Sequence, residues 1–358
     1  MKKYNSVKIE VQAAEALCLL LEQVPAIKLL DIQQRKAHGA GYEADLVARL
    51  DASGNQHTLV CEVKFDGQPR HVRLALLQLR DYVARRANDA TPVLIAPYLS
   101  AQAQALCREY EVGYLDLEGN AHLVFGGVFI KRQVASKPAV ERREFRSLFM
   151  PKAAQILRLM LRKPARVWLV AELAEAAGVS LGHASNVRVA LLGREWAQVS
   201  NEGMFLCDPD ALLDAWRESY KPPAGKRQGF YTTLHGAAFE SAVRGLHPAA
   251  DAGWTTLASF SAAQWLAPYG RTGTQYFYAD EAGFDKLRAA LKLSPASKGE
   301  NVVVTVLEDL GLFRDIVEPA PGVICTSAVQ TYLDLTAAGE RGREAADHLR
   351  QERLQWRG

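Results

Sequence analysis

The sequence predicts an α/β protein built from several domains, and three observations lead to this prediction. The 358 residues are enough for two or three domains of roughly 150 residues each. Strand and helix patterns alternate over residues 8–132 and again after Phe230, whereas residues 151–217 have the pattern of short helices followed by a hairpin. Hydrophobic residues make up 49% of the chain and charged residues 23%, which excludes a largely disordered protein.

Changes in composition set the predicted domain boundaries. Residues 133–150 are basic and interrupted by Pro138, and residues 218–229 contain Pro-Pro-Ala-Gly, so both stretches are predicted to be linkers. The resulting division is an α/β domain at 1–132, a helical domain at 151–217 and a second α/β domain, of unknown role, at 230–358.

The chain contains no predicted membrane or export segment. Its basic N-terminus is not followed by an apolar run, and no stretch approaches the ~18 consecutive apolar residues of a membrane helix. The five cysteines occur singly among apolar neighbours, which favours reduced and mostly buried thiols over disulfides or a zinc site. We therefore expect a cytoplasmic protein without a membrane partner.

The elements of the first domain follow from residue periodicity. Val11–Leu21 has apolar residues at helical spacing, and Tyr42–Leu50 and Thr58–Phe65 alternate around a Ser-Gly-Asn turn, which predicts a hairpin. The later stretches predict a basic helix, a buried strand, a helix and a final strand pair, at 70–87, 92–96, 100–110 and 112–117 with 121–125. This order implies a sheet with crossover helices.

Asp45, Glu62 and Lys64 are the candidates for chemistry in this domain. Side chains alternate along a strand, so Glu62 and Lys64 share the face opposite the apolar residues of their strand, and the hairpin can bring Asp45 beside Glu62. Two carboxylates and a lysine suit a divalent cation, Mg²⁺ or Mn²⁺ held by Asp45 and Glu62, with the ammonium near an attacking water. The alternative is an ordinary surface pair of Glu and Lys.

The pattern Asp-(x16)-Glu-x-Lys, in this order of elements, resembles the PD-(D/E)xK nuclease superfamily over about residues 8–130. Gln78 and Tyr82, one helical turn apart, resemble the Gln-x-x-x-Tyr motif of its RecB-like branch. Glu15 occupies the place of the acidic residue often found on the first helix of that family. The resemblance implies a restriction-endonuclease-like domain, which either cleaves DNA with these residues or only holds nucleic acid or a partner.

The helical domain has the sequence of a helix-turn-helix followed by a hairpin. Lys152–Leu161 and Trp168–Ala177 predict two helices, and Ala184, Val187 and Leu191 form the core stripe of a third. Gly178 suits the end of the second helix and Ser180 the start of the third. With strands expected around Asn201-Glu202-Gly203, the whole resembles the winged helix-turn-helix of bacterial regulators.

Several polar residues of this region are candidates for contact with double-stranded DNA. Ser185, Asn186 and Arg188 lie off the core stripe and can reach bases or phosphates, with His183 beside them and Ser180 at the start of the helix. Because Val189 and Leu192 also fall on the outer side, packing or dimerisation is the alternative. The basic linker adds candidates for phosphate contact, although these charges could equally only face solvent: Arg142, Arg143 and Arg146.

The sequence of the last domain predicts another α/β arrangement, with two helices at the end. The expected elements are helix 234–245, strands 255–259 and 275–278, helix 281–292, strand 302–307 and helices 327–337 and 340–355.

The segments Tyr114–Ala121, Val329–Leu335 and Gly342–Ala346 resemble the AbiEi family of type IV antitoxins, in its branch of transcriptional regulators. The resemblance implies a repressor that binds its own operator, functionally linked to a nucleotidyltransferase toxin that it need not touch. We therefore expect a DNA-binding regulator that needs no cofactor to bind DNA, with a Mg²⁺-dependent DNA nuclease as the alternative. An oligomer is compatible with the sequence.

Overall fold

The structure is a computed structural model. It describes residues 2–34, 43–86, 89–134, 143, 145, 147–246, 253–270, 272–296 and 298–356. The chain divides into two compact units. The first comprises Met1–Arg142 and Leu192–Glu195, and the second comprises Arg143–Leu191 and Trp196–Gly358. The protein is thus a mixed α/β chain of more than one domain, as the sequence predicts.

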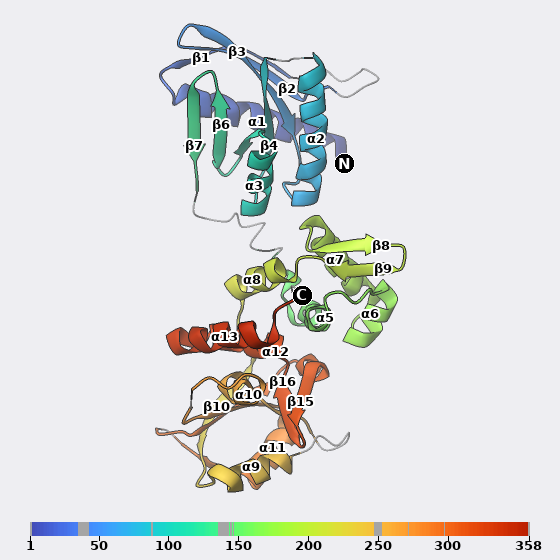
Figure 1. Ribbon diagram of the computed structural model, residues 1–358, viewed down its shortest axis with the longest axis vertical. Helices are drawn as coiled ribbons and strands as arrows, with labels where there is room; N and C mark the ends of the chain where they lie inside the picture. Colours follow the sequence, from blue (N-terminus) through green and yellow to red (C-terminus); the bar gives the residue numbers. More distant parts are fainter. Residues whose placement is uncertain are drawn as a thin grey trace. The chain divides into compact units, whose positions relative to one another are not determined.

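A seven-stranded mixed sheet forms the centre of the first unit, and its strands lie in chain order, β1 to β7 (Figure 1). The pairs β3–β4 and β4–β5 are parallel, and the remaining neighbours are antiparallel. The elements of this unit are α1 (Lys2–Glu22), β1 (Ile27–Gln34), β2 (Leu46–Ala52), β3 (Asn55–Val63), α2 (Pro69–Arg86), β4 (Ala90–Ala96), α3 (Ala101–Glu109), β5 (Gly113–Asp116), β6 (Ala121–Phe125) and β7 (Val128–Arg132).

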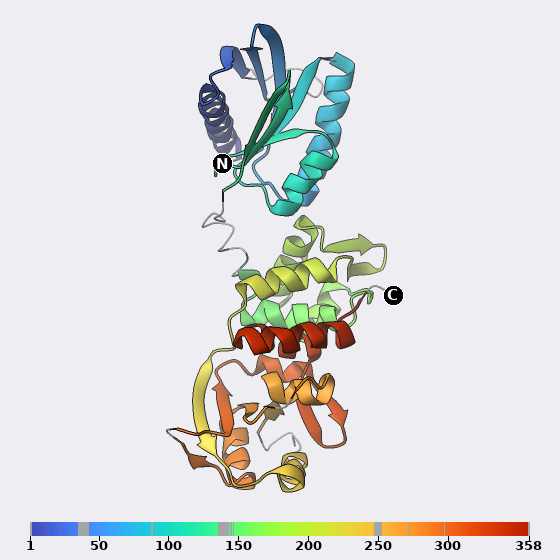
Figure 2. The same cartoon turned by 60° about the vertical axis from the view of Figure 1, so that its left-hand side comes forward.

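Helices cover both faces of this sheet (Figure 2). Leu17 and Leu21 of α1 pack with Leu46 and Cys61 into one buried core. On the other face, α2 and α3 form a second core, to which Val60 contributes from β3. Because neighbouring residues of a strand point to opposite faces, the buried run Leu59–Cys61 of β3 is apolar on both sides. Glu62 lies where that apolar run is interrupted.

The second unit begins with helices and a hairpin. We call α5–α8 with the β8–β9 hairpin the helical segment. Trp168 and Met204 exchange two backbone hydrogen bonds, at 2.8 and 2.9 Å, so an isolated bridge joins Trp168 to β9 of the two-stranded hairpin. The elements are α5 (Pro151–Arg162), α6 (Val170–Ala177), α7 (Leu181–Gly193), β8 (Ala197–Ser200), β9 (Gly203–Leu206) and α8 (Pro209–Ser219).

A second seven-stranded sheet, the C-terminal sheet, follows, with strand order β13-β10-β14-β12-β11-β16-β15. Its elements are β10 (Gly225–Tyr231), α9 (Gly236–Arg244), β11 (Thr255–Leu257), α10 (Ser259–Leu266), β12 (Gln275–Ala279), α11 (Glu281–Ala290), β13 (Ser294–Pro295), β14 (Val302–Leu307), the 3₁₀ helix η1 (Leu310–Asp315), β15 (Ile316–Ala320), β16 (Val323–Thr326), α12 (Ala328–Thr336) and α13 (Gly339–Arg353). No helix among the described residues is long and apolar enough to cross a membrane.

The structure describes parts of both predicted linkers. Residues 225–229, expected to be linker, are the first part of β10, which pairs with β14 over six residue pairs. In the basic stretch 133–150, the Phe145 ring contacts Trp196, and Phe149 stacks on Trp216 with ring centroids 5.5 Å apart. The end of that stretch is therefore packed against the helical segment. Arg143 is exposed, whereas Arg142 and Arg146 lie outside the described residues.

Candidate functional sites

The predicted hairpin places Asp45 opposite Glu62. Leu46 pairs with Cys61 across β2 and β3, and one residue further this antiparallel register sets Asp45 against Glu62. Asp45 Oδ2 accepts a hydrogen bond of 2.8 Å from the backbone N–H of Val63, which fixes its position at the start of β2. Glu62 is only 5% exposed, and Lys64 Nζ donates to its Oε1. The structure therefore brings together all three residues that the sequence singled out.

Burial and the neighbouring carboxylate raise the pKa of Asp45 to about 6. Burial is the larger cause and the charge of Glu62 the second, while the Val63 N–H opposes both. Glu10 of α1 makes a smaller contribution that also raises the pKa of Asp45. Glu15, expected at this site, is exposed on the same helix.

The two helix residues predicted to accompany this site lie on α2. Gln78 is exposed, and Tyr82 is half-buried against the core formed with α2 and α3. A tyrosine in that position contributes to packing whatever else it does.

The acidic pair offers oxygen ligands from two carboxylates. Within the described ranges, no three His, Cys, Asp or Glu side chains are gathered into a metal-binding cluster. Mg²⁺ is commonly bound through one or two carboxylates and keeps several water ligands. Asp45 and Glu62 fit an ion of that kind, and Lys64 would compete with it for Glu62.

In the helical segment, the turn before α7 has the predicted cap residues. Gly178 ends α6 in the left-handed conformation, with φ at 64°, and its N–H bonds back to Ala174 and Glu175. Ser180 Oγ accepts from the backbone N–H of His183 at 3.3 Å and lies 2.8 Å from its ring Nδ1. The side chain of Ser180 therefore caps α7 and orients His183.

The polar residues predicted to contact DNA are not equivalent in the structure. His183, Ser185 and Asn186 are exposed on α7, whereas Arg188 is only partly exposed. Ala184, Val187 and Leu191 are the buried stripe, as predicted. Since α7 contains no acidic residue, its outer face carries nothing that repels a phosphate backbone.

The helical segment is joined to the C-terminal sheet by buried polar side chains. Arg158 of α5 donates to Gln330 Oε1 on α12 at 3.0 Å, and Gln330 Nε2 donates to Tyr220 at 2.8 Å and to Asp334 at 2.9 Å. Tyr220 and Tyr278 also donate to Asp334 Oδ1, the latter at 2.9 Å. We call these five residues the polar cluster.

Burial raises the pKa of Asp334 to about 6, against the opposing effect of its three hydrogen-bond donors. Asp315 strengthens the same junction, because it accepts from Arg162 and lies 3.8 Å from Arg158. On α13, Arg350 binds Asp210 at 2.8 Å and Asp214 on α8, and Figure 1 shows these two helices side by side. Sequence reasoning missed these pairings, since their members are far apart along the chain and no local pattern marks them.

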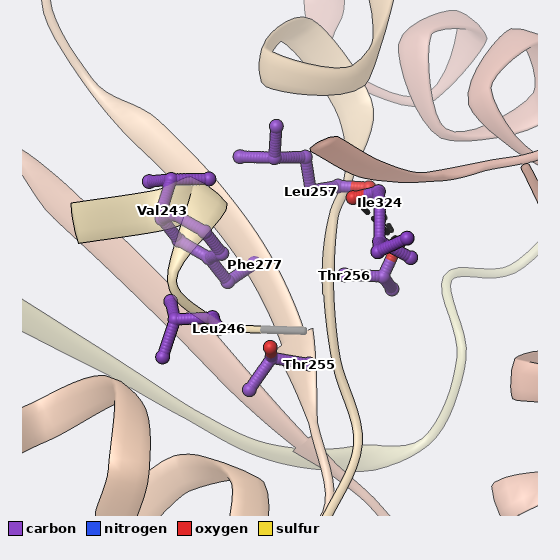
Figure 3. A pocket seen from close by; sticks show the side chains of 7 residues that line it. All are labelled: Val243, Leu246, Thr255, Thr256, Leu257, Phe277 and Ile324. Carbon is purple, nitrogen blue, oxygen red and sulfur yellow. Dashed lines mark hydrogen bonds between the residues drawn. The ribbon is translucent and has the colours of Figure 1, made fainter. Parts of the chain in front are cut away.

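A small pocket opens beside β11, β12 and α9 in the C-terminal sheet (Figure 3). Its lining is mainly apolar, with Val243, Leu246, Leu257, Phe277 and Ile324. The hydroxyl of Thr256 is already bonded to the Ile324 carbonyl at 3.2 Å. The lining contains no charged side chain that would select a ligand.

Comparison with known proteins places a family resemblance in the second unit. Residues 205–355 match the family model described as "Transcriptional regulator, AbiEi antitoxin, Type IV TA system". The match contains Val329–Leu335 and Gly342–Ala346 but not Tyr114–Ala121. In the latter segment, the buried Asp116 accepts from Leu99 and Asn120, so it holds a turn of the first sheet.

No curated protein matches the chain. One solved structure, "Structure of EndoMS in apo form", is similar at 20% identity and a TM-score of 0.21. That similarity covers 29% of this chain and 45% of the other, so the chain spans less than half of that protein.

Proposed function

We propose that the protein is a transcriptional regulator that binds double-stranded DNA through a winged helix-turn-helix, residues 151–217. The observation that carries this proposal is the outer face of α7, which exposes Ser185 and Asn186 without any acidic residue. The capped turn before α7 and the β8–β9 hairpin, joined to Trp168 by an isolated bridge, support a recognition helix followed by a wing. The family match of residues 205–355 supports a regulator independently of this geometry.

The same family points to the biological setting. We propose that the protein is the antitoxin of a type IV toxin–antitoxin system and represses its own operon. Its partner is operator DNA, and its link to a nucleotidyltransferase toxin requires no contact between the two proteins. Binding of DNA by α7 needs no cofactor, and the exposed Arg143, with Arg142 and Arg146, adds contacts to phosphates.

Binding of the full chain to the DNA preceding its own gene tests this proposal. The double variant Asn186→Ala, Arg188→Ala should lose roughly tenfold or more in affinity, because one good base contact is worth about 1–3 kcal/mol and loss of a contact to a phosphate weakens binding further. Arg288→Ala, which removes an exposed side chain of α11, is the matched control. Equal affinity of the double variant and the wild type would exclude α7 as the reading helix.

A second candidate function is Mg²⁺-dependent cleavage of DNA by a restriction-endonuclease-like first unit. The juxtaposition of Asp45 and Glu62, with Lys64 bonded to Glu62, favours it. In that case Asp45 and Glu62 would hold the metal ion, which would polarise a phosphate and activate water. Lys64 would assist the attacking water, while Gln78, Tyr82 and an acidic residue of α1 would position the strand. We favour a non-catalytic first unit, because a repressor that cut its own operator would defeat itself.

Incubation of single- and double-stranded DNA with the protein and Mn²⁺ distinguishes the two functions. Cleavage by the wild type that is absent from Asp45→Ala and Glu62→Ala would establish the nuclease. Metal-dependent changes in thermal unfolding, with the same two variants as controls, report binding even where no strand is cut.

A further inference from the structure

The residues on the outer side of α7 form one stripe at helical spacing. Gly182, Ser185, Asn186 and Val189 lie at positions i, i+3, i+4 and i+7, which share a face of a helix. This stripe lies opposite the buried stripe that includes Ala184. Val189 is 63% exposed, the most open large apolar side chain of the helix. A surface that approached α7 along its outer side would therefore meet an amide and an aliphatic group.

Neither the backbone conformation nor the packing around residue 182 requires a glycine there. Its backbone is helical, and an added Cβ would meet only Ser180 Oγ, at 3.9 Å. Glycine within a helix costs roughly 1 kcal/mol relative to alanine. The fold would thus be more stable with alanine at position 182. Glycine instead leaves the backbone uncovered by a side chain at the start of the outer stripe. Such a position lets another molecule come unusually close.

Arg188 lies away from this stripe. It follows Ala184 by four residues and is therefore its neighbour on the helix, next to the core, which agrees with its partial burial. From that side of the helix, a guanidinium reaches the phosphates that border the major groove more readily than the base edges inside it. Arg188 is accordingly suited to a phosphate and not to a base.

We propose that α7 reads a step of A·T base pairs in the major groove. Asn186 bonds to N6 and N7 of an adenine, Val189 packs on the 5-methyl group of a neighbouring thymine, and Gly182 allows the close approach. Asparagine suits adenine and an aliphatic group suits the thymine methyl, while three residues of helix rise about 4.5 Å, close to one base-pair step. This inference rests on the proposed function, since it names what the DNA-binding helix recognises.

The thymine methyl can be removed without changing any protein residue. Duplexes are first selected from a random pool by the full chain and then resynthesised with deoxyuridine in place of each thymine in turn. Replacement of the one thymine that Val189 contacts should weaken binding by the wild type about threefold to fivefold, which is the effect of losing one buried methyl group. Val189→Ala should bind the thymine and uracil duplexes alike. Val124→Ala removes an equally apolar side chain of β6, 54% exposed and outside the helical segment, and should keep the wild-type difference.

A second variant separates stability from recognition. Gly182→Ala should raise the midpoint of thermal unfolding by about 2–4 °C and yet weaken specific binding about tenfold. An unchanged affinity, or the same loss from uracil in Val189→Ala as in the wild type, would overturn the inference while leaving DNA binding by α7 intact. Failure of the full chain to select any duplex would overturn the proposed function and this inference together.

Discussion

Arg158 of α5 donates to Gln330 of α12 at 3.0 Å, and both side chains are buried. Gln330 uses its amide group in both directions, because its oxygen accepts from Arg158 and its nitrogen donates to Tyr220 and Asp334. Helix α5, the first of the helical segment, is therefore held to the C-terminal sheet by buried hydrogen bonds between side chains.

Replacing Gln330 by alanine should destabilise the second unit by about 2–4 kcal/mol. The change leaves the buried Arg158 without that acceptor and takes a donor from Asp334, and buried polar groups are costly when unsatisfied. Urea unfolding measures the effect. Arg288→Ala, which breaks an exposed pair with Asp285, should cost less than about 0.5 kcal/mol. Similar small losses for both variants would mean that the polar cluster contributes little.

Asp334 should make the second unit less stable as the pH rises. Its pKa in the folded protein, about 6, is above the usual value near 3.9, so the folded state binds the proton more tightly. The stability that this provides is complete below pH ~4 and is lost as the pH rises through about 6. The unfolding free energy of the wild type minus that of Asp334→Asn should therefore fall by about 2 kcal/mol from pH 4 to pH 7. Asp285→Asn, at an exposed position, is the control; a flat difference for Asp334→Asn would contradict the prediction.

Metal binding at the acidic pair should strengthen with pH in the same range. A metal ion competes with the proton on Asp45, whose pKa is about 6, so Mn²⁺ affinity should increase between pH 5 and 7 and then level off. Isothermal titration at several pH values measures this. Glu62→Gln removes a ligand and should abolish the binding, whereas Glu15→Gln, at an exposed position, should not. If Glu62→Gln bound Mn²⁺ as tightly as the wild type, the ion would have to bind elsewhere.

The basic stretch before α5 should add affinity that does not depend on DNA sequence. Replacing Arg142, Arg143 and Arg146 by alanine should weaken binding to specific and random duplexes by similar factors. For each phosphate that the variant no longer neutralises, the slope of log K against log salt should become shallower by about 0.9. Fluorescence anisotropy over a series of salt concentrations measures this slope. If the variant and the wild type have the same slope, these charges only face solvent.

The sequence predicted the features that local rules determine. The alternation along β3 fixed which side chains face Asp45, and the Gly178 and Ser180 caps marked the turn before α7. Both depend on neighbours within a few residues, so the pattern alone was sufficient.

Features that depend on distant partners were missed. Gly225–Tyr231 has the composition of a turn, yet it is a strand because β14 supplies a partner, and a Cβ on Gly225 would come within 2.2 Å of the Val306 carbonyl oxygen. Helix α10 and strands β15 and β16 were not expected either. The polar cluster could not be foreseen, because neither Arg158 nor Asp334 has a neighbour in sequence that marks it for burial.

The place of β10 limits how this protein can be divided. The strand follows directly from the helical segment and lies between β13 and β14. A cut at residue 224 would leave the sheet whole, but it would separate Arg158 and Tyr220 from their buried partners Gln330 and Asp334. A fragment ending after β10 would instead carry an unpaired edge, which invites aggregation. The helical segment and the C-terminal sheet are therefore not independent modules, and recombination could transfer them between proteins only as one piece.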